Sequence, residues 1–308
     1  MTSEQQTASE LVTILVSTYN GSQFLAQQLD SLYRQSYKNI RILVRDDGSS
    51  DSTRDILERA CRQGKIDILE GNINLGPAAS FFELLRQAAL TNTAYVAFCD
   101  QDDVWAAEKI TRAITALSKT NACPALYCSR LELVDEQLNP LGNTLIPRKI
   151  GFGNALVENI AVGCSTVINR KAIDLIVKNM PANVYMHDWW CYLVVACFGE
   201  VIFDAVPTIK YRQHANNSVG APTGWLSSLR RKIKRFTKGR LWISEQIVVF
   251  LQIFADKIRP SDRLVLNQFL AARSLFCKRI PLALSKQIWR QRWFDNIILR
   301  FLILINRV

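Results

Sequence analysis

The stretch AYVAFCDQDDVW, residues 94–105, joins an apolar run to a cluster of acidic side chains. The apolar run over 94–99 predicts a buried strand. Three carboxylates follow at its carboxyl end, namely Asp100, Asp102 and Asp103. Carboxylates this close repel one another, so they need a cation or strong donors nearby, and Mg²⁺ and Mn²⁺ prefer such oxygen ligands. The alternative is a polar turn that caps a helix starting near Trp105.

Upstream of this stretch, apolar runs alternate with helical patterns. The runs predict strands at 11–18, 40–45 and 66–69, and the patterns between them predict helices at 22–34 (with Ser22 as N-cap), 53–63 and 79–90. This alternation predicts an open α/β sheet, in which ligands bind beyond the carboxyl ends of the strands. Polar clusters at 18–21, 46–51 and 100–103 follow three such ends, which indicates one site with a nucleotide as its occupant.

Downstream of Trp105, the elements are less regular. The patterns predict helices at 107–119, 171–179 and 187–198, and strands at 125–134 and 201–204. Gly163, within residues 159–168, indicates a close approach of the backbone. We therefore expect an α/β domain over residues 1–220, with a mixed, Rossmann-like sheet and flanking helices. A helical, basic and amphipathic region over 221–308 would follow it.

The net charge of +11 is concentrated near the C-terminus. Residues 1–220 hold 20 Lys and Arg against 23 Asp and Glu, whereas residues 221–308 hold 18 against 4. A dense basic run over 230–240 and an apolar block over 289–303 indicate an anionic partner, either a membrane surface or a nucleic acid. No apolar stretch reaches the roughly 18 residues that a membrane-spanning helix needs.

The cysteines and the N-terminus bear on the cellular compartment. The eight cysteines are scattered and form no CxxC pair, and the N-terminus is polar rather than signal-like. We expect reduced thiols in a cytoplasmic protein. A His-rich metal site is excluded because the chain has only two histidines, His187 and His214.

Five ordered motifs make the chain resemble the inverting family 2 glycosyltransferases. They are VSTYNG at 16–21, RDDGSSD at 45–51, CDQDDVW at 99–105, HDWW at 187–190 and YRQH at 211–214. The resemblance covers about residues 10–220 and extends to the rhamnosyltransferase-like branch that builds bacterial surface polysaccharides such as O-antigen. It implies a GT-A fold that binds a nucleotide-sugar donor, with Mn²⁺ or Mg²⁺ as cofactor.

The resemblance also implies which residues bind the donor nucleotide. Thr18 and Tyr19 would line the pocket. Asp47 would accept a hydrogen bond from the pyrimidine ring N–H, and Asp100 would lie near the ribose. Asn74 lies in a segment that either borders the nucleotide, as in the family, or forms an ordinary turn.

The metal and the diphosphate are assigned in the same way. Asp102 would hold the metal that bridges the two phosphates, and Asp103 either supports it or caps a helix. His214 would complete the metal shell; the alternative is a loop histidine bonded to the backbone. Arg212 and Gln213 are expected as diphosphate contacts.

Asp188 is the expected general base, because an inverting transfer needs a carboxylate to take the proton of the attacking acceptor hydroxyl. The family often places an acidic residue before this Asp, but this chain has His187, which is expected among the diphosphate or sugar contacts although its exact role stays open. Trp189 and Trp190 face different directions on a helix, so one is expected to contact a sugar and the other to lie in the core.

These observations together predict a metal-dependent, inverting glycosyltransferase of the hexosyltransferase type. The donor could be dTDP-L-rhamnose, and the acceptor a lipid-linked or growing polysaccharide. Residues 225–308 would bind an anionic membrane surface, which places the protein peripherally on the inner face of the cytoplasmic membrane. Two alternatives are a nucleic-acid-binding protein, for which no motif accompanies the charge, and a sugar nucleotidyltransferase, whose Gly-rich basic loop is missing from VSTYNGSQ.

Overall fold

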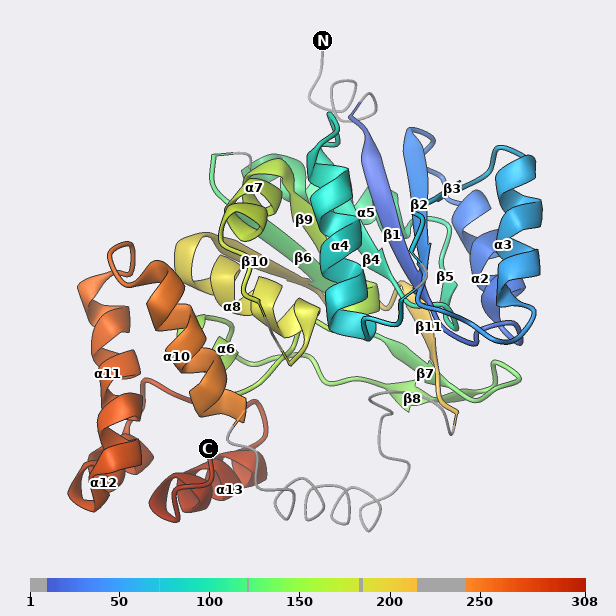
Figure 1. The fold of residues 1–308 in the computed structure, drawn as a ribbon. Helices are drawn as coiled ribbons and strands as arrows, with labels where there is room; N and C mark the ends of the chain where they lie inside the picture. The colour runs from blue at the N-terminus through green and yellow to red at the C-terminus, as the bar shows by residue number, and fades with distance from the viewer. Residues whose placement is uncertain (1–9, 72, 121, 183–184, 215–241) are drawn as a thin grey trace. The chain divides into compact units, whose positions relative to one another are not determined.

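The computed structural model describes residues 10–308 except 72, 121, 183–184 and 215–241 (Figure 1). The basic run at 230–240 therefore lies outside the described residues. The described chain forms two compact units. The first holds residues up to Ile146 together with Ala161–His214, and the second holds Pro147–Ile160 and the described residues after 241. Residues 147–160, which the sequence analysis assigns to the first domain, thus belong to the second unit.

The first unit is built on a seven-stranded mixed sheet with the strand order β10-β6-β9-β4-β1-β2-β3. Its strands are β1 (Val12–Thr18), β2 (Ile40–Asp46), β3 (Asp67–Ile68), β4 (Tyr95–Cys99), β6 (Ala125–Ser129), β9 (Val167–Asn169) and β10 (Glu200–Asp204). β1 pairs in parallel with β2 and β4, whereas β9 runs antiparallel to its neighbours β4 and β6. The predicted α/β sheet is confirmed.

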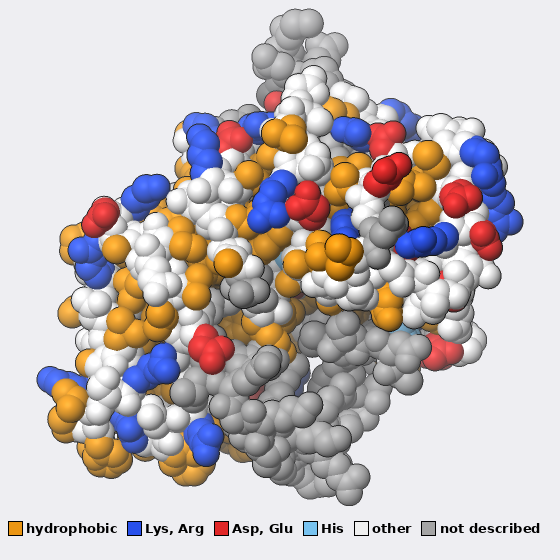
Figure 2. All heavy atoms as spheres, viewed as in Figure 1, with side chains coloured by type: hydrophobic (Ala, Val, Ile, Leu, Met, Phe, Trp, Pro, Cys, Tyr) orange, Lys and Arg blue, Asp and Glu red, His pale blue; other side chains and the backbone are white. Residues whose placement is uncertain are grey.

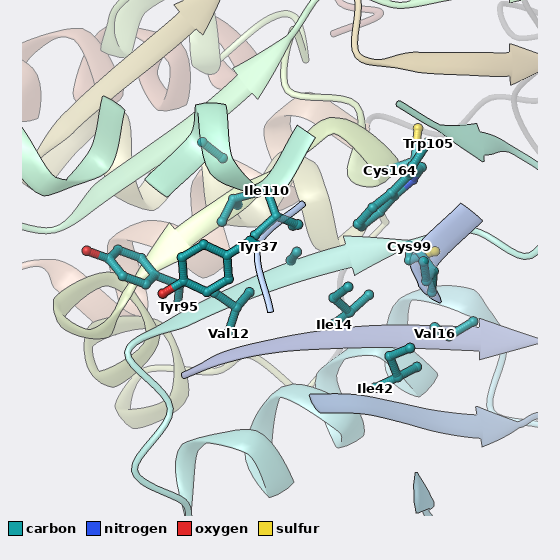
Figure 3. Close-up of a cluster of buried hydrophobic side chains, with 14 of the residues drawn as sticks. Val12, Ile14, Val16, Tyr37, Ile42, Tyr95, Cys99, Trp105, Ile110 and Cys164 are labelled. Carbon is teal, nitrogen blue, oxygen red and sulfur yellow. The ribbon is translucent and has the colours of Figure 1, made fainter. Parts of the chain in front are cut away.

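Helices cover both faces of this sheet. On one face, Val12, Ile14 and Val16 of β1 pack in one buried cluster with α2 (Leu25–Tyr33), α3 (Thr53–Arg62) and α5 (Lys109–Leu117) (Figure 3). The other face carries α4 (Pro77–Ala89), α7 (Arg170–Lys178) and α8 (His187–Phe198) (Figure 1). This two-sided burial explains why the strands are continuous apolar runs.

A second, four-stranded sheet has the order β5-β11-β7-β8. Its strands are β5 (Val104–Trp105), β11 (Ile209–Arg212), β7 (Glu132–Val134) and β8 (Pro140–Asn143). The single strand predicted at 125–134 is wrong, because β6 ends at Ser129 and the chain changes sheet before β7. In the first sheet, a 3₁₀ turn, η2 (Gly163–Ser165), precedes the short β9.

Two predicted helix starts are wrong. No helix starts near Trp105, which lies in β5 opposite Ile209; α5 begins only at Lys109. Ser22 does not cap α2, whose N-cap is Phe24. The backbone N–H of Ser22 instead donates to the carboxylate of Asp51, 3.0 Å away. In both cases a long-range partner outweighs the local helix signal.

The second unit contains α6 (Phe152–Ala155), α10 (Trp242–Phe254), α11 (Pro260–Ser274), α12 (Phe276–Leu284) and α13 (Trp293–Leu304). Residues 147–160 join it through hydrogen bonds to the segment before α13. The indole of Trp289 donates to Lys149 O at 3.1 Å, and the Asn154 side chain donates to Trp289 O at 3.0 Å. Among the described residues, no helix has the length and apolar character to cross a bilayer.

Candidate active site

The three predicted polar clusters meet at one edge of the large sheet. In the parallel register, Thr18 at the end of β1 lies opposite Asp46 of β2, and Val16 lies opposite Cys99 of β4. Residues 18–21, 46–51 and 100–103 therefore leave three neighbouring strands at the same edge. This is the place where an open α/β sheet binds its ligands.

Gln101 fastens the end of β4 to the end of β1, a role that the sequence analysis did not assign. Its side-chain oxygen accepts from Tyr19 N–H at 2.9 Å, and its side-chain nitrogen donates to Tyr19 O at 3.0 Å. A Cβ on Gly21 would lie 2.2 Å from the same oxygen, so a side chain there would push the Gln101 amide away from Tyr19. The spacing of the motifs gives no local signal for this contact.

Thr18 and Tyr19 occupy different environments. The buried Thr18 hydroxyl donates to Asp46 at 2.9 Å, so it serves first to hold the loop after β2. The Tyr19 side chain is 51% exposed at the edge of the sheet. Of these two residues, Tyr19 is therefore the one whose side chain is open to a ligand.

Asp47 lies against the loop that contains Asn74. Its carboxylate accepts from the backbone N–H groups of Leu75 and Gly76, each at 2.8 Å, and forms a buried ion pair with Arg45. The Asn74 side chain also accepts from Gly76 N–H, at 3.1 Å. Asp47 and the Asn74 loop thus form one structural element beside the strand ends, which the sequence analysis treated as two separate predictions.

Asp102 and His214 come from different parts of the chain and meet directly. Nε2 of His214 lies 2.9 Å from Oδ2 of Asp102. β11 positions the histidine, because His214 follows two residues after that strand, and its ring packs 5.1 Å from the ring of Phe24. The structure therefore brings together the two residues expected to share a metal.

Arg212 is directed into the protein. Its guanidinium donates to Asp102 O at 2.8 Å, to the side-chain oxygen of Gln27 at 2.5 Å and to Glu136 O. Its backbone N–H donates to the carboxylate of Asp103 at 3.1 Å. With 1% of its surface exposed, Arg212 fixes the 102–103 turn. A direct contact with a diphosphate stays a prediction and would require it to leave these partners.

Gln213 lies between Arg212 and His214 and is held through its backbone. Its N–H donates to Val134 O at 2.8 Å, and its side-chain amide donates to Arg212 O at 3.2 Å. Because the residue is partly exposed, its diphosphate contact also stays a prediction.

Asp100 lies among like charges. Its withdrawal from solvent, together with the nearby carboxylates of Asp102 and Asp188, raises the pKa of Asp100 to about 8. Burial, together with the neighbouring carboxylates of Asp102 and Asp100, also raises the pKa of Asp103. The carboxylates that follow β4 and the one that begins α8 therefore share a single electrostatic environment.

Asp188 is held by the turn η2. Its Oδ2 accepts from Gly163 N–H at 2.8 Å, and the carboxylate also accepts from its neighbour's N–H, Trp189, at 2.6 Å. A Cβ on Gly163 would lie 3.0 Å from His187, which is too close, and 3.6 Å from Asp188, which is an ordinary contact, so a side chain there would press on the His187 ring. The sequence predicts a close approach of the backbone at Gly163 but gives no local signal that links it to Asp188.

His187 is a buried aromatic member of the core. Its ring stacks on Phe81 at 4.1 Å and lies 5.0 Å from Phe98 of β4. Burial lowers the pKa of His187 to about 3, so the imidazole is neutral at ordinary pH. The two tryptophans that follow differ in exposure: Trp190 is fully buried, whereas Trp189 is partly exposed.

The side-chain ligands at this edge of the sheet fit a hard divalent cation. Asp102 supplies a carboxylate and His214 an imidazole nitrogen, and the excess negative charge around Asp100 calls for a positive ion. Buried Oδ2 of Asp103 receives no N–H or O–H hydrogen bond from the described residues. The ligand atoms of Asp100, Asp103 and Cys164 lie within 4.8 Å of one another, but burial raises the pKa of the Cys164 thiol and keeps it neutral.

Comparisons with known proteins agree with this geometry. Residues 13–176 match the family model described as glycosyl transferase family 2. The chain is 30% identical over 303 residues to the dTDP-rhamnosyl transferase RfbG of Shigella flexneri, covering 94% of this chain and 99% of that protein. It is 31% identical over 188 residues to the Escherichia coli glucosyltransferase WfgD, covering 60% of this chain and 69% of that protein.

Solved structures show the same fold. Residues 1–349 of Staphylococcus aureus TarS, crystallised with UDP-GlcNAc, match with a TM-score of 0.60 at 13% identity, over 96% of this chain and 81% of that chain. The mannosyltransferase PcManGT of Pyrobaculum calidifontis, crystallised with GDP-Man and Mn²⁺, gives 0.51 at 14% identity, over 97% and 88%. On the strength of the family match and the full-length relative, this chain belongs to glycosyltransferase family 2.

Proposed function

We propose that this glycosyltransferase moves a sugar, with inversion, from a nucleoside-diphosphate donor to a lipid-linked or growing polysaccharide. The observation that carries the proposal is the shared environment of Asp100, Asp102 and Asp188, with His214 bonded to Asp102. The donor we favour is dTDP-L-rhamnose, which would supply L-rhamnose, because the relative that matches over the full length is described as a dTDP-rhamnosyl transferase.

In the proposed mechanism, Asp188 takes the proton of the acceptor hydroxyl as that oxygen attacks the anomeric carbon opposite the leaving diphosphate. The N–H groups of Gly163 and Trp189 keep this carboxylate oriented. The nucleoside would lie beside Tyr19 and the paired Asp47–Asn74 element, with Asp100 toward the ribose. One acceptor position on Oδ2 of Asp47 is free of the contacts described above and suits the pyrimidine N–H.

Asp102 and His214 would hold Mn²⁺ or Mg²⁺ in this scheme. When bound, the ion supplies Lewis-acid neutralisation of the leaving diphosphate. Arg212 keeps the 102–103 turn in place from behind, through the contacts of its guanidinium and backbone. Trp189, partly exposed next to the proposed base, is placed to contact a sugar ring.

A panel of nucleotide sugars tests this function. With Mn²⁺ or Mg²⁺ present, we expect dTDP-L-rhamnose to raise the melting temperature most, because a ligand that binds only the folded state stabilises it. Transfer to an undecaprenyl-diphosphate-linked glycan should then release dTDP and give a product of inverted anomeric configuration by NMR. Strong stabilisation by another nucleotide sugar would replace the donor, and a retained configuration would overturn the mechanism.

The proposed acceptor is attached to a lipid, so we also propose that the enzyme works peripherally at an anionic membrane surface on the cytoplasmic side. The excess of 18 basic over 4 acidic residues in 221–308 supports this localisation. Family membership makes the nucleic-acid-binding and nucleotidyltransferase alternatives unnecessary.

A further inference from the structure

Two neighbouring helices of the second unit each expose an apolar stripe. The stripe on α12 consists of Phe276, Ile280 and Leu284. The stripe on α13 consists of Trp293, Ile297 and Phe301 and is continued by Ile305, which directly follows the helix. Within each stripe the residues are four positions apart, so they share one face of their helix. Their exposed fractions lie between 47% for Ile280 and 73% for Leu284.

The stripe on α13 is not the face that holds the unit together. Leu299, Leu302 and Ile303 of the same helix are buried and provide that packing. α13 is thus apolar on a buried side and on an exposed side, whereas a surface helix of a soluble domain normally turns a polar face to water. Exposed apolar surface of this extent marks a site of interaction.

The two stripes lie on helices that are fixed to each other. α12 and α13 pack together, and the guanidinium of Arg300 on α13 donates to Ala283 O at the end of α12 and to Ser285 O. Arg279 of α12 donates in turn to Leu304 O at 3.4 Å. The two apolar stripes are therefore carried by one preformed pair of helices.

The charges around this surface select its partner. Residues 276–308 contain seven Lys and Arg against a single acidic residue, Asp295. Lys278, Lys286, Arg292 and Arg307 are exposed among the apolar side chains. Figure 2 shows hydrophobic and basic side chains intermixed over the second unit. Aromatic and aliphatic groups beside basic ones are typical of surfaces that enter the interface of an anionic bilayer.

We propose that the α12–α13 surface inserts its apolar stripes into the headgroup region of an anionic bilayer, with its basic side chains on the lipid phosphates. This inference rests on the proposed work at a membrane and names the residues that make the contact. To the basic run at 230–240 and the apolar block at 289–303, which the sequence indicated, it adds the stripe on α12 and identifies the exposed residues that make the contact. The helices lie along the bilayer and do not cross it.

Two native thiols allow a direct test. Cys277 on α12 and Cys61 on α3 are both exposed, but they lie in different units. An environment-sensitive fluorophore is attached to Cys277 in a Cys61→Ser, Cys123→Ser protein, and to Cys61 in the matching Cys277→Ser, Cys123→Ser protein. With vesicles of phosphatidylglycerol and phosphatidylethanolamine, we expect a blue shift at Cys277 and none at Cys61. Equal responses at both positions, or none at Cys277, would overturn the proposal.

Co-sedimentation with the same vesicles measures the energetic share of the stripes. The double variant Trp293→Ser, Phe301→Ser should lower the partition coefficient by at least about tenfold. Burial of each aromatic side chain in the bilayer contributes more free energy than the roughly 1.4 kcal/mol that corresponds to a tenfold change. The matched control is Leu264→Ser, at an exposed leucine on α11 of the same unit, which should change little. Unchanged sedimentation of the double variant would overturn the proposal.

Two further readouts distinguish lipid binding from a damaged donor site and from self-association. Donor-induced thermal stabilisation should be equal in the wild type and the Trp293→Ser, Phe301→Ser variant, so a failure of membrane binding is distinguishable from a failure of the enzyme. If the Cys277 probe shifts with protein concentration in the absence of vesicles, and light scattering reports a dimer, the surface binds a second copy and the lipid proposal is wrong.

Discussion

Two clusters of carboxylates follow β2 and β4, the strands on either side of β1 in the large sheet, yet their surroundings differ. After β2, Asp46 accepts hydrogen bonds from Thr18, Ser49 and Arg54, and Asp51 accepts from Thr53 and Ser22. These bonds outweigh burial and lower the pKa of Asp51 to about 2. After β4, burial and the like charges of Asp102 and Asp188 raise the pKa of Asp100 to about 8.

The difference in surroundings distinguishes carboxylates that stabilise the fold from carboxylates that await a ligand. After β2, Asp46 and Asp51 receive their hydrogen-bond donors from the protein, so these two carboxylates are complete and fasten loops to the sheet. The cluster after β4 gathers carboxylates without enough donors, an arrangement that costs stability and persists where a ligand completes it. The predictions below test this contrast, beginning with the largest effect.

Replacing the proposed base should give the largest loss. Asp188→Asn is expected to lower kcat by about a thousandfold, because the amide cannot accept the acceptor proton. Donor-induced stabilisation should persist, since the change leaves the strand ends intact. Asp51→Asn is the control from the other cluster and should retain most of its turnover. A near-normal rate in Asp188→Asn would assign the base to another group.

Asp102→Asn should weaken metal binding by about a hundredfold or more, because the variant loses an anionic ligand while keeping its shape. Calorimetric titration with Mn²⁺ in the presence of dTDP measures this loss. His214→Ala should weaken binding in the same direction but less, because a neutral ligand contributes less charge. Unaltered Mn²⁺ affinity in both variants would remove the metal site from this edge.

Gly163→Ala should lower kcat by about tenfold and leave the donor KM nearly unchanged, because the new methyl group presses on the His187 ring and so shifts the adjacent Asp188 from its N–H donor. Steady-state kinetics with varied donor resolves the two constants. His187→Phe should remain active, since the neutral ring acts only by packing between Phe81 and Phe98. Loss of activity in His187→Phe at unchanged stability would indicate a chemical role.

The stability of the metal-free enzyme should fall as pH rises from about 4 to 8. The folded state keeps a proton on Asp100 up to a pKa of about 8, whereas the ordinary value is 3.8, so folding binds protons throughout this window. Stabilisation by Mg²⁺ should therefore be larger at pH 8 than at pH 6. Melting curves at both pH values measure the difference, and Asp100→Asn should reduce it.

Asp51→Asn gives the smallest effect and tests the complete cluster. It should cost about 1 kcal/mol of stability at neutral pH, because the charged acceptor of the Thr53 and Ser22 donors is lost. The folded pKa of about 2 lies below the ordinary 3.8, so this contribution is present above pH 4 and disappears as pH falls toward 2. Urea titrations of both proteins at pH 7 and pH 3 should therefore converge at the lower pH.

The sequence predicted those elements whose formation depends on residues close together in the chain. Continuous apolar runs identified β1, β2 and β4, and the parallel pairing of those strands then gathered their polar ends at one edge. The change of sheet between β6 and β7, the strand at Trp105 and the internal direction of Arg212 depend on partners far along the chain. The Gln101–Tyr19 contact and the link between Gly163 and Asp188 join residues 82 and 25 positions apart, which no periodicity encodes.

The most direct test is a crystal structure with Mn²⁺ and dTDP, in which anomalous scattering locates the ion. We predict one peak within coordination distance of Asp102 and His214, with none at Asp46 or Asp51. An ion bound at the cluster after β2, or a nucleotide held with no ion near Asp102, would contradict the claim that the incomplete carboxylate cluster is the working site.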